Sequence, residues 1–218
     1  MAPWHLDHDL KYALRGFRRE PGLALIATLI LAVGIGANTA VFSIVNPLLL
    51  RPLPFPESDR LVWIANTGTT GLSGATYRVD LYEEMARSTR SFQELTAYFA
   101  FFGFSGRTLT GRGEPERLMA VDLAPRFFEV LGLQPASGRL FTPEEHRRGG
   151  PRAALLTHAL WQRRFAGDPS LVGSAITINL QAVTVVGIMP ASFDFASVFT
   201  PGTRVDMFLP ADLDVMRP

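Results

Sequence analysis

The chain has 218 residues, 47% of them hydrophobic, and its 21 basic residues nearly balance its 20 acidic ones. A chain without a basic excess lacks the electrostatic footprint of a nucleic-acid-binding protein. The absence of cysteine excludes a disulfide framework, a thiol nucleophile and a thiolate metal site.

Residues 1–20 have the pattern of an amphipathic basic helix. Apolar residues recur at helical spacing from Leu6 to Phe17, and the basic residues lie largely off that face. Such a helix is suited to the membrane interface, although it could also pack on another protein domain. Basic residues before a membrane helix keep the N-terminus in the cytoplasm. We therefore expect residues 1–20 to be cytoplasmic and everything after about residue 50 to lie outside. The basic residues are Lys11, Arg15, Arg18 and Arg19.

Residues 21–50 contain no Asp, Glu, Lys or Arg and predict a transmembrane helix with its exit. Roughly 20 helical residues cross a bilayer core about 30 Å thick. One alternative is a buried helix of a soluble protein, but such helices are rarely this long and free of charged residues. A second alternative is a cleaved signal peptide, but its apolar region would be only about 7–15 residues long.

Small and polar residues recur along this helix three or four positions apart and form one stripe. In lipid, small side chains let helices approach closely, while Ser, Thr and Asn hydrogen-bond across the contact. The stripe therefore predicts packing against further membrane helices. The alternative is that small residues are simply common in membrane helices. The stripe residues are Ala32, Gly36, Thr39, Ala40, Ser43 and Asn46.

The segment after the helix predicts a stiff exit from the membrane. Pro47 should end or kink the helix. Pro52, Pro54 and Pro56 alternate with other residues and favour an extended backbone. Arg51 marks the expected headgroup boundary.

Residues 51–218 mix predicted strands and helices without strict alternation, which indicates an incomplete α+β domain. The expected strands are residues 61–66, 95–104, 117–121, 153–157, 175–179, 182–188 and 206–209, with the pair at 175–188 forming a hairpin. The expected helices are residues 80–86, 125–131 and 159–165, with Gly132 capping the second.

The sequence shows no catalytic, cofactor or metal motif, and we expect no enzymatic activity. A phosphate-binding loop needs Gly-Lys-Ser or Gly-Lys-Thr, but the single lysine, Lys11, has no such context. His5 and His8 could share a helix face, yet surface histidines near a terminus explain them more simply. Glu144-Glu145-His146 is interpreted as a solvated helix start. A Ser-His-Asp triad is recognised by geometry, so spacing alone leaves it open.

Several stretches in order resemble the start of MacB/FtsX-like ABC transporter permeases. The resemblance covers roughly residues 9–210 and departs from the family at Pro47, where a small residue is expected. The matching stretches are residues 9–15, 34–43, 50–54, 60–62, 90–92, 113–117, 127–132, 138–142, 160–165 and 185–190.

This resemblance implies a MacB-like periplasmic core domain after an N-terminal membrane helix, in a fragment of a larger permease. It implies a bacterial inner-membrane location and, as partners, a cytoplasmic ABC ATPase, further permease helices, membrane lipid and a periplasmic protein. The implied function is to couple ATP hydrolysis by the partner to motion of the periplasmic domain, for efflux or release of substrate. The alternative from a different class is an exported binding or adaptor domain on a single anchor.

Overall fold

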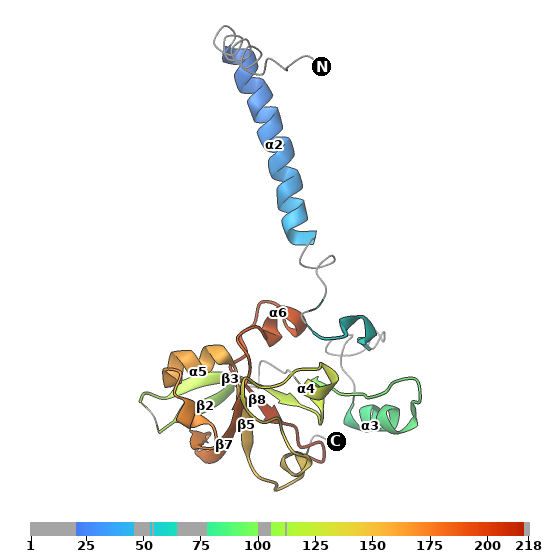
Figure 1. Cartoon of the computed structure of the whole chain (residues 1–218), viewed down its shortest axis with the longest axis vertical. Coiled ribbons are helices and arrows are strands. Elements are labelled where there is room, and N and C mark those ends of the chain that lie inside the picture. The colour runs from blue at the N-terminus through green and yellow to red at the C-terminus, as the bar shows by residue number, and fades with distance from the viewer. Residues whose placement is uncertain are drawn as a thin grey trace, which may run out of the picture. The chain divides into compact units, whose positions relative to one another are not determined.

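The computed structural model describes residues 21–45, 53, 55–64, 78–99, 106–111 and 113–215 (Figure 1). The chain divides into two compact units, Met1–Pro52 and Leu53–Pro218. The predicted segment 1–20, together with Asn46, Pro47, Arg51, Pro52 and Pro54, lies outside the described residues.

The first unit contains one long helix, α2 (Pro21–Val45). At about 1.5 Å per residue its 25 residues extend for about 37 Å, enough to cross a bilayer core. Residues Pro21–Ser43 qualify as a membrane span by length and composition, and none of the qualifying window is buried. The helix therefore has the length and the apolar composition of a membrane span.

The second unit contains the strands, which close into a ring. The hydrogen-bonded order runs β3-β2-β6-β7-β5-β8, and β8 pairs back with β3. The β3–β8 and β5–β7 pairs are parallel and the other pairs are antiparallel. β1 extends the ring beside β3, and β4 does so beside β7. The bounds are β1 Tyr98–Phe99, β2 Gly106–Thr110, β3 Glu116–Leu123, β4 Ser137–Gly138, β5 Ala153–Leu156, β6 Ala175–Ile178, β7 Gln181–Ile188 and β8 Met207–Pro210.

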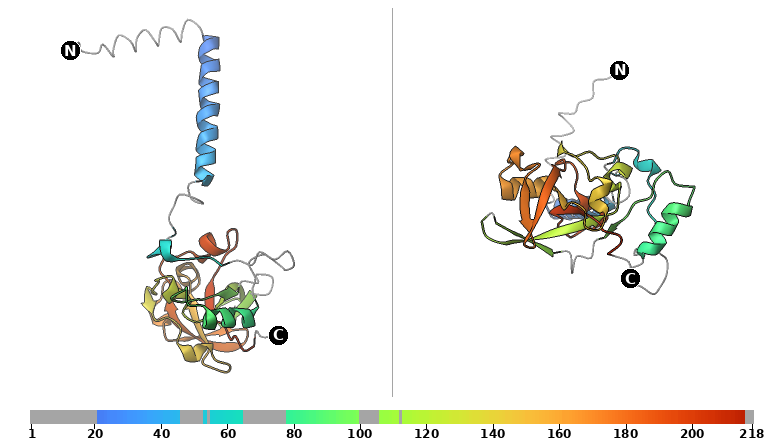
Figure 2. Two further views of the ribbon diagram at one scale, coloured as in Figure 1. Left: turned by 90° about the vertical axis from the view of Figure 1, so that its right-hand side faces the viewer. Right: turned by 90° about the horizontal axis from the view of Figure 1, so that it is seen from below.

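Short helices lie before and between these strands. Figures 1 and 2 show α3 and α5 on opposite sides of this unit. α5 begins after Thr157, whose hydroxyl accepts a hydrogen bond from the backbone N–H of Leu160 and so caps the helix. The bounds are η2 Ser58–Arg60, α3 Val79–Ser88, α4 Phe127–Val130, η3 Pro143–His146, α5 His158–Phe165, η4 Pro169–Leu171 and α6 Phe195–Phe199.

The strands separate two apolar cores because alternate side chains of a strand point to opposite faces. On β5, Ala153 and Leu155 belong to the first core, while Ala154 and Leu156 belong to the second. The first core is rich in phenylalanine and includes residues of α4 and α6. The second core is mainly aliphatic and includes Leu160 and Phe165 of α5. The fold is α+β, as predicted.

Most predicted elements are confirmed with small shifts of their ends. The hairpin forms between β6 and β7, and Gly132 follows α4 with a positive φ of 68°, as expected of a helix cap. The predicted helices at 80–86 and 159–165 correspond to α3 and α5, and the last predicted strand corresponds to β8.

Three local predictions were wrong. Residues 61–64 form no strand, because no neighbouring strand pairs with them there. Of the described part of the predicted strand 95–104, only Tyr98–Phe99 is a strand, since it pairs with β3 at two positions only. The interpretation of Glu145 as solvated was also wrong. Its carboxylate is buried, pairs with Arg139 at 2.7 Å and accepts the backbone N–H of Thr142 at 2.8 Å.

Candidate functional site

The stripe on α2 is exposed in the structure. Ala32, Gly36 and Ala40 follow one another at intervals of four and therefore share a face of the helix. All described stripe residues are exposed, and a Cβ added at Gly36 would meet no atom within 4 Å. The hydroxyl of Ser43 donates a hydrogen bond to the carbonyl oxygen of Thr39 at 2.7 Å. Packing of this face against other membrane helices remains a prediction.

The segment that follows the helix enters the second unit as part of its core. Phe55 is 7% exposed and belongs to the first core. Its ring lies 5.9 Å from that of Phe199 in α6 and 6.3 Å from that of Phe193. Pro56, the one described proline of the predicted exit, packs on the turn at Gly132. Phe55 and Pro56 thus fix the beginning of the domain by side-chain packing.

A wide cleft opens beside this segment and is the candidate functional site of the domain. It has a volume of about 900 Å³ and lies among residues 53–64, α3, residues 91–99 and α4. Ligand sites in proteins are usually clefts of roughly 300–1,000 Å³ lined by apolar and aromatic side chains. The aromatic lining residues are Phe55, Trp63, Tyr82, Phe92, Tyr98, Phe99, Phe127 and Phe199.

Exposed apolar side chains gather around this cleft. Leu53, Val62, Trp63 and Phe92 line it and are all exposed, Trp63 by 56%. Single exposed apolar residues are normal, but a contiguous group of them marks an interaction surface. The cleft therefore has the composition of a surface that contacts an apolar or aromatic group.

Charged pairs lie at the edge of the cleft. Arg60 contacts Glu57 at 2.5 Å and donates to the side chain of Gln93 at 3.2 Å. Arg126 pairs with Glu94. Burial raises the pKa of Tyr82 to about 12, and the nearby carboxylates of Glu94 and Glu83 act in the same direction. The Tyr82 hydroxyl is therefore neutral at ordinary pH and donates to the carbonyl oxygen of Leu95 at 3.3 Å.

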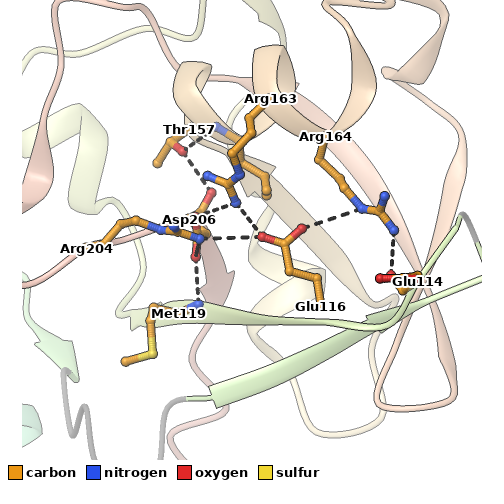
Figure 3. Close-up of polar contacts among 9 residues, drawn as sticks. Glu114, Glu116, Met119, Thr157, Arg163, Arg164, Arg204 and Asp206 are labelled. Atoms are coloured by element: carbon orange, nitrogen blue, oxygen red, sulfur yellow. Dashed lines mark hydrogen bonds and ion pairs between the residues drawn. The ribbon is translucent and has the colours of Figure 1, made fainter.

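A second polar cluster lies outside the cleft and joins α5 to the strands (Figure 3). Asp206 is 1% exposed, and its carboxylate contacts Arg163 at 3.4 Å and Arg204 at 2.9 Å. Glu116 of β3 contacts Arg163, Arg164 and Arg204. These contacts hold α5, β3 and the start of β8 together, so we assign the cluster a structural role.

Among the residues that the structure describes, no group of three or more His, Asp or Glu side chains could hold a metal ion. His5 and His8 lie outside them. The cleft has apolar walls and paired charges at its edge, a lining typical of ligand-binding clefts.

Sequence reasoning missed the cleft because its walls come from distant stretches. Trp63 belongs to a predicted strand that does not form, whereas Phe99 lies in the short strand β1, and both side chains line the cleft. No sequence-based expectation covers Phe193, Phe195 and Phe199, of which Phe199 lines the cleft. Their density over seven residues was the available signal.

Comparison with known protein families shows which family this chain belongs to. A family model described as the MacB-like periplasmic core domain matches residues 24–216. The chain belongs to this family. The match to the MacB-like periplasmic core domain begins inside α2 and ends after β8, so it includes the helix as well as the cleft-bearing domain. The resemblance seen in the sequence is thereby confirmed.

Solved structures of transporter domains match this chain at low identity and with TM-scores below 0.5. The periplasmic region of MacB from Actinobacillus actinomycetemcomitans is 13% identical, with a TM-score of 0.48 over 68% of this chain and 63% of that one. The extracellular domain of the noncanonic ABC-type transporter YknZ from Gram-positive bacteria is 18% identical, with a TM-score of 0.43 over 58% and 59%. This chain thus spans less than two thirds of either structure. No curated protein matches it.

Proposed function

We propose that the chain is the N-terminal part of an ABC transporter permease whose outer domain moves in response to a cytoplasmic ATPase. One observation carries the proposal: the family match runs without a break from a charge-free helix into the outer domain. A membrane helix in the same chain as a periplasmic domain would connect that domain mechanically to the membrane.

The proposed division of labour places nucleotide chemistry on the partner. No phosphate-binding loop occurs in the sequence, so ATP would be bound and hydrolysed by a separate or fused ATPase. The permease helices would transmit the motion, and the outer domain would alternate between two arrangements. The chain itself would be no enzyme.

In this scheme the aromatic cleft is the surface on which the domain meets a substrate or a periplasmic partner. Its apolar walls would bury an apolar group, while the Arg60–Glu57 and Arg126–Glu94 pairs would stay hydrated at the edge. The stripe on α2 would face the further permease helices. Efflux of a small molecule or peptide and release of a membrane-bound substrate both fit this arrangement.

The experiment is affinity purification of the tagged protein from its native membrane in mild detergent, followed by mass spectrometry. We expect an ABC ATPase with a phosphate-binding loop to copurify, and an unrelated membrane protein with the same tag is the control. An ATPase in neither sample, or stoichiometric ATP binding by the purified chain in calorimetry, would contradict the proposal.

Orientation is tested separately. A phosphatase that works only in the periplasm, fused after Pro218, should be active if residues 1–20 are cytoplasmic. Activity of a reporter that works only in the cytoplasm, fused at the same site, would reverse the proposed topology of the inner-membrane protein.

A further inference from the structure

The segment from Leu53 to Ile64 is held to the domain by side chains. Among the described residues, its backbone hydrogen bonds run within the segment, from Phe55 to Leu53, from Arg60 to Glu57 and from Leu61 to Ser58. Apart from η2, it forms no regular secondary structure there. A segment that no strand pairs with depends on its side-chain contacts for its position.

Two aromatic residues of the segment, eight positions apart, converge on one ring. Phe55 is buried, and its ring lies 5.9 Å from Phe199 with the planes 21° apart. Trp63 is more than half exposed, yet its ring lies 6.1 Å from Phe199 and 5.7 Å from Tyr98. Aromatic pairs at centroid distances of about 4.5–7 Å attract one another beyond simple area burial.

Phe199 is itself firmly placed on the strand scaffold. Its ring lies 4.8 Å from Phe195, which is 1% exposed and packs at 5.5 Å against Phe208 of β8. The backbone oxygen of Phe199 accepts a hydrogen bond from the hydroxyl of Tyr98 at 3.3 Å. Ring contacts therefore link Phe55 and Trp63 through Phe199 and Phe195 to strand β8.

We propose that Phe199 is a positioning residue that fastens the segment leaving the membrane helix to the outer domain, so that segment and strand ring move as one body. Phe199 also lines the cleft, so a group bound there would touch the same ring. The fastening is a property of the domain alone. Its use in transport rests on the proposed function.

The absence of cysteine allows a clean test in the full 218-residue chain in lipid nanodiscs. Leu53→Cys carries a nitroxide spin label at the start of the segment, and Leu180→Cys carries one at the distant β6–β7 turn. Phe199→Ala should increase the mobile fraction of the label at position 53 at least twofold and leave the label at position 180 unchanged.

Phe141→Ala is the matched control. Phe141 packs against the same core, but its ring contacts the ring of His146 rather than a described aromatic residue of the segment from Leu53 to Ile64. Equal mobility at position 53 in the parent chain and Phe199→Ala would overturn the proposal, as would an equal increase in Phe141→Ala. If Phe199→Ala fails to fold, Phe199→Leu decides, because leucine keeps an apolar side chain but removes the ring that Phe55 and Trp63 contact. An unchanged label at position 53 would then reject the fastening.

In the permease with its ATPase, Phe199→Ala should keep ATP hydrolysis and lose most of the transport that accompanies it. The label experiment needs no ATPase. If Phe199→Ala makes the label at position 53 mobile but no ATPase copurifies with the chain, the proposed function is rejected and the fastening stands. If that label stays immobile, the fastening alone is rejected.

Discussion

Arg204 and Asp206 form a two-bonded ion pair at the start of β8, with Nε–Oδ1 at 2.9 Å and Nη2–Oδ2 at 3.1 Å. The same carboxylate accepts the backbone N–H of Met119 at 3.0 Å. Asp206 therefore joins a surface arginine to the backbone of β3 across the parallel β3–β8 pair.

We expect Asp206→Asn to lower the free energy of unfolding by about 2–3 kcal/mol, because hydrogen bonds to a charged group are each worth about 1.5–3 kcal/mol. Arg163 and Arg204 remain partly exposed and can turn to water, which limits the loss. Urea denaturation followed by circular dichroism measures the change. Glu114→Gln, a nearby exposed position, is the control and should stay within about 0.5 kcal/mol of the parent. Equal stability of both variants would refute the structural role.

Stability should fall in acid through Glu145. Burial raises the pKa of this carboxyl, but the hydrogen bond from Arg139 and the one from Thr142 outweigh it and hold the pKa below its usual value of 4.5. A lowered folded-state pKa contributes stability above the unfolded value, and this is lost as pH falls below 4.5. Urea denaturation between pH 7 and pH 3 should show a shallower decline in Glu145→Gln. An unchanged slope would show that other groups dominate.

Tyr82 should make the free energy of unfolding depend on pH in the alkaline range. Its pKa is raised from 10.0 to about 12 by burial and by the carboxylates of Glu94 and Glu83. A raised folded-state pKa gives stability that is complete below pH 10 and is lost as pH rises toward 12. Tyr82→Phe should therefore flatten the decline of unfolding free energy over this interval. Absorbance titration of tyrosine ionisation should lose its latest step in the same variant.

The β6–β7 turn should accept a stabilising substitution. Asn179 and Leu180 have φ values of 49° and 64°, which is the conformation of a two-residue hairpin turn that prefers Asn-Gly. Leu180 is 86% exposed, so its side chain contributes little packing. Leu180→Gly should raise the unfolding free energy by about 0.5–1 kcal/mol, because glycine adopts this φ without strain. Thermal unfolding should show a higher midpoint, and a lower one would contradict the argument.

The membrane stripe is tested by enlarging its smallest residue. Gly36→Leu should leave insertion intact but weaken packing against a neighbouring helix, where each contact is worth on the order of 1 kcal/mol. In the full-length permease we would measure recovery of the ATPase complex. Val33→Leu, away from the stripe, should have no effect. Equal recovery of both variants would mean that the small residues reflect ordinary composition.

The sequence predicted those elements whose cause is local. The alternation in residues 175–188 was enough for the β6–β7 hairpin, and the charge-free run was enough for α2. The capping-box spacing of Thr142 and Glu145 was also present, and it could have shown that Glu145 is held by backbone rather than solvated.

The rest of the fold depends on pairings between strands that lie far apart in the sequence. β8 lies between β3 and β5, and no local pattern tells which strands flank it. Residues 61–64 have strand composition, but no strand lies beside them, and so Trp63 packs on Tyr98 and Phe199 instead. The cleft was missed for the same reason, because its walls come together only in the folded domain.

The closed ring of strands limits how other proteins can recognise this domain. Among the described residues, each of its six strands has a partner on both sides, which leaves little backbone edge for an incoming peptide to extend the sheet. In the part of the chain that the structure describes, β1 and β4 add two residues each at its margins. We therefore expect a partner of the strand ring to be recognised mainly by side chains, so that substitutions could change its specificity without changing the backbone.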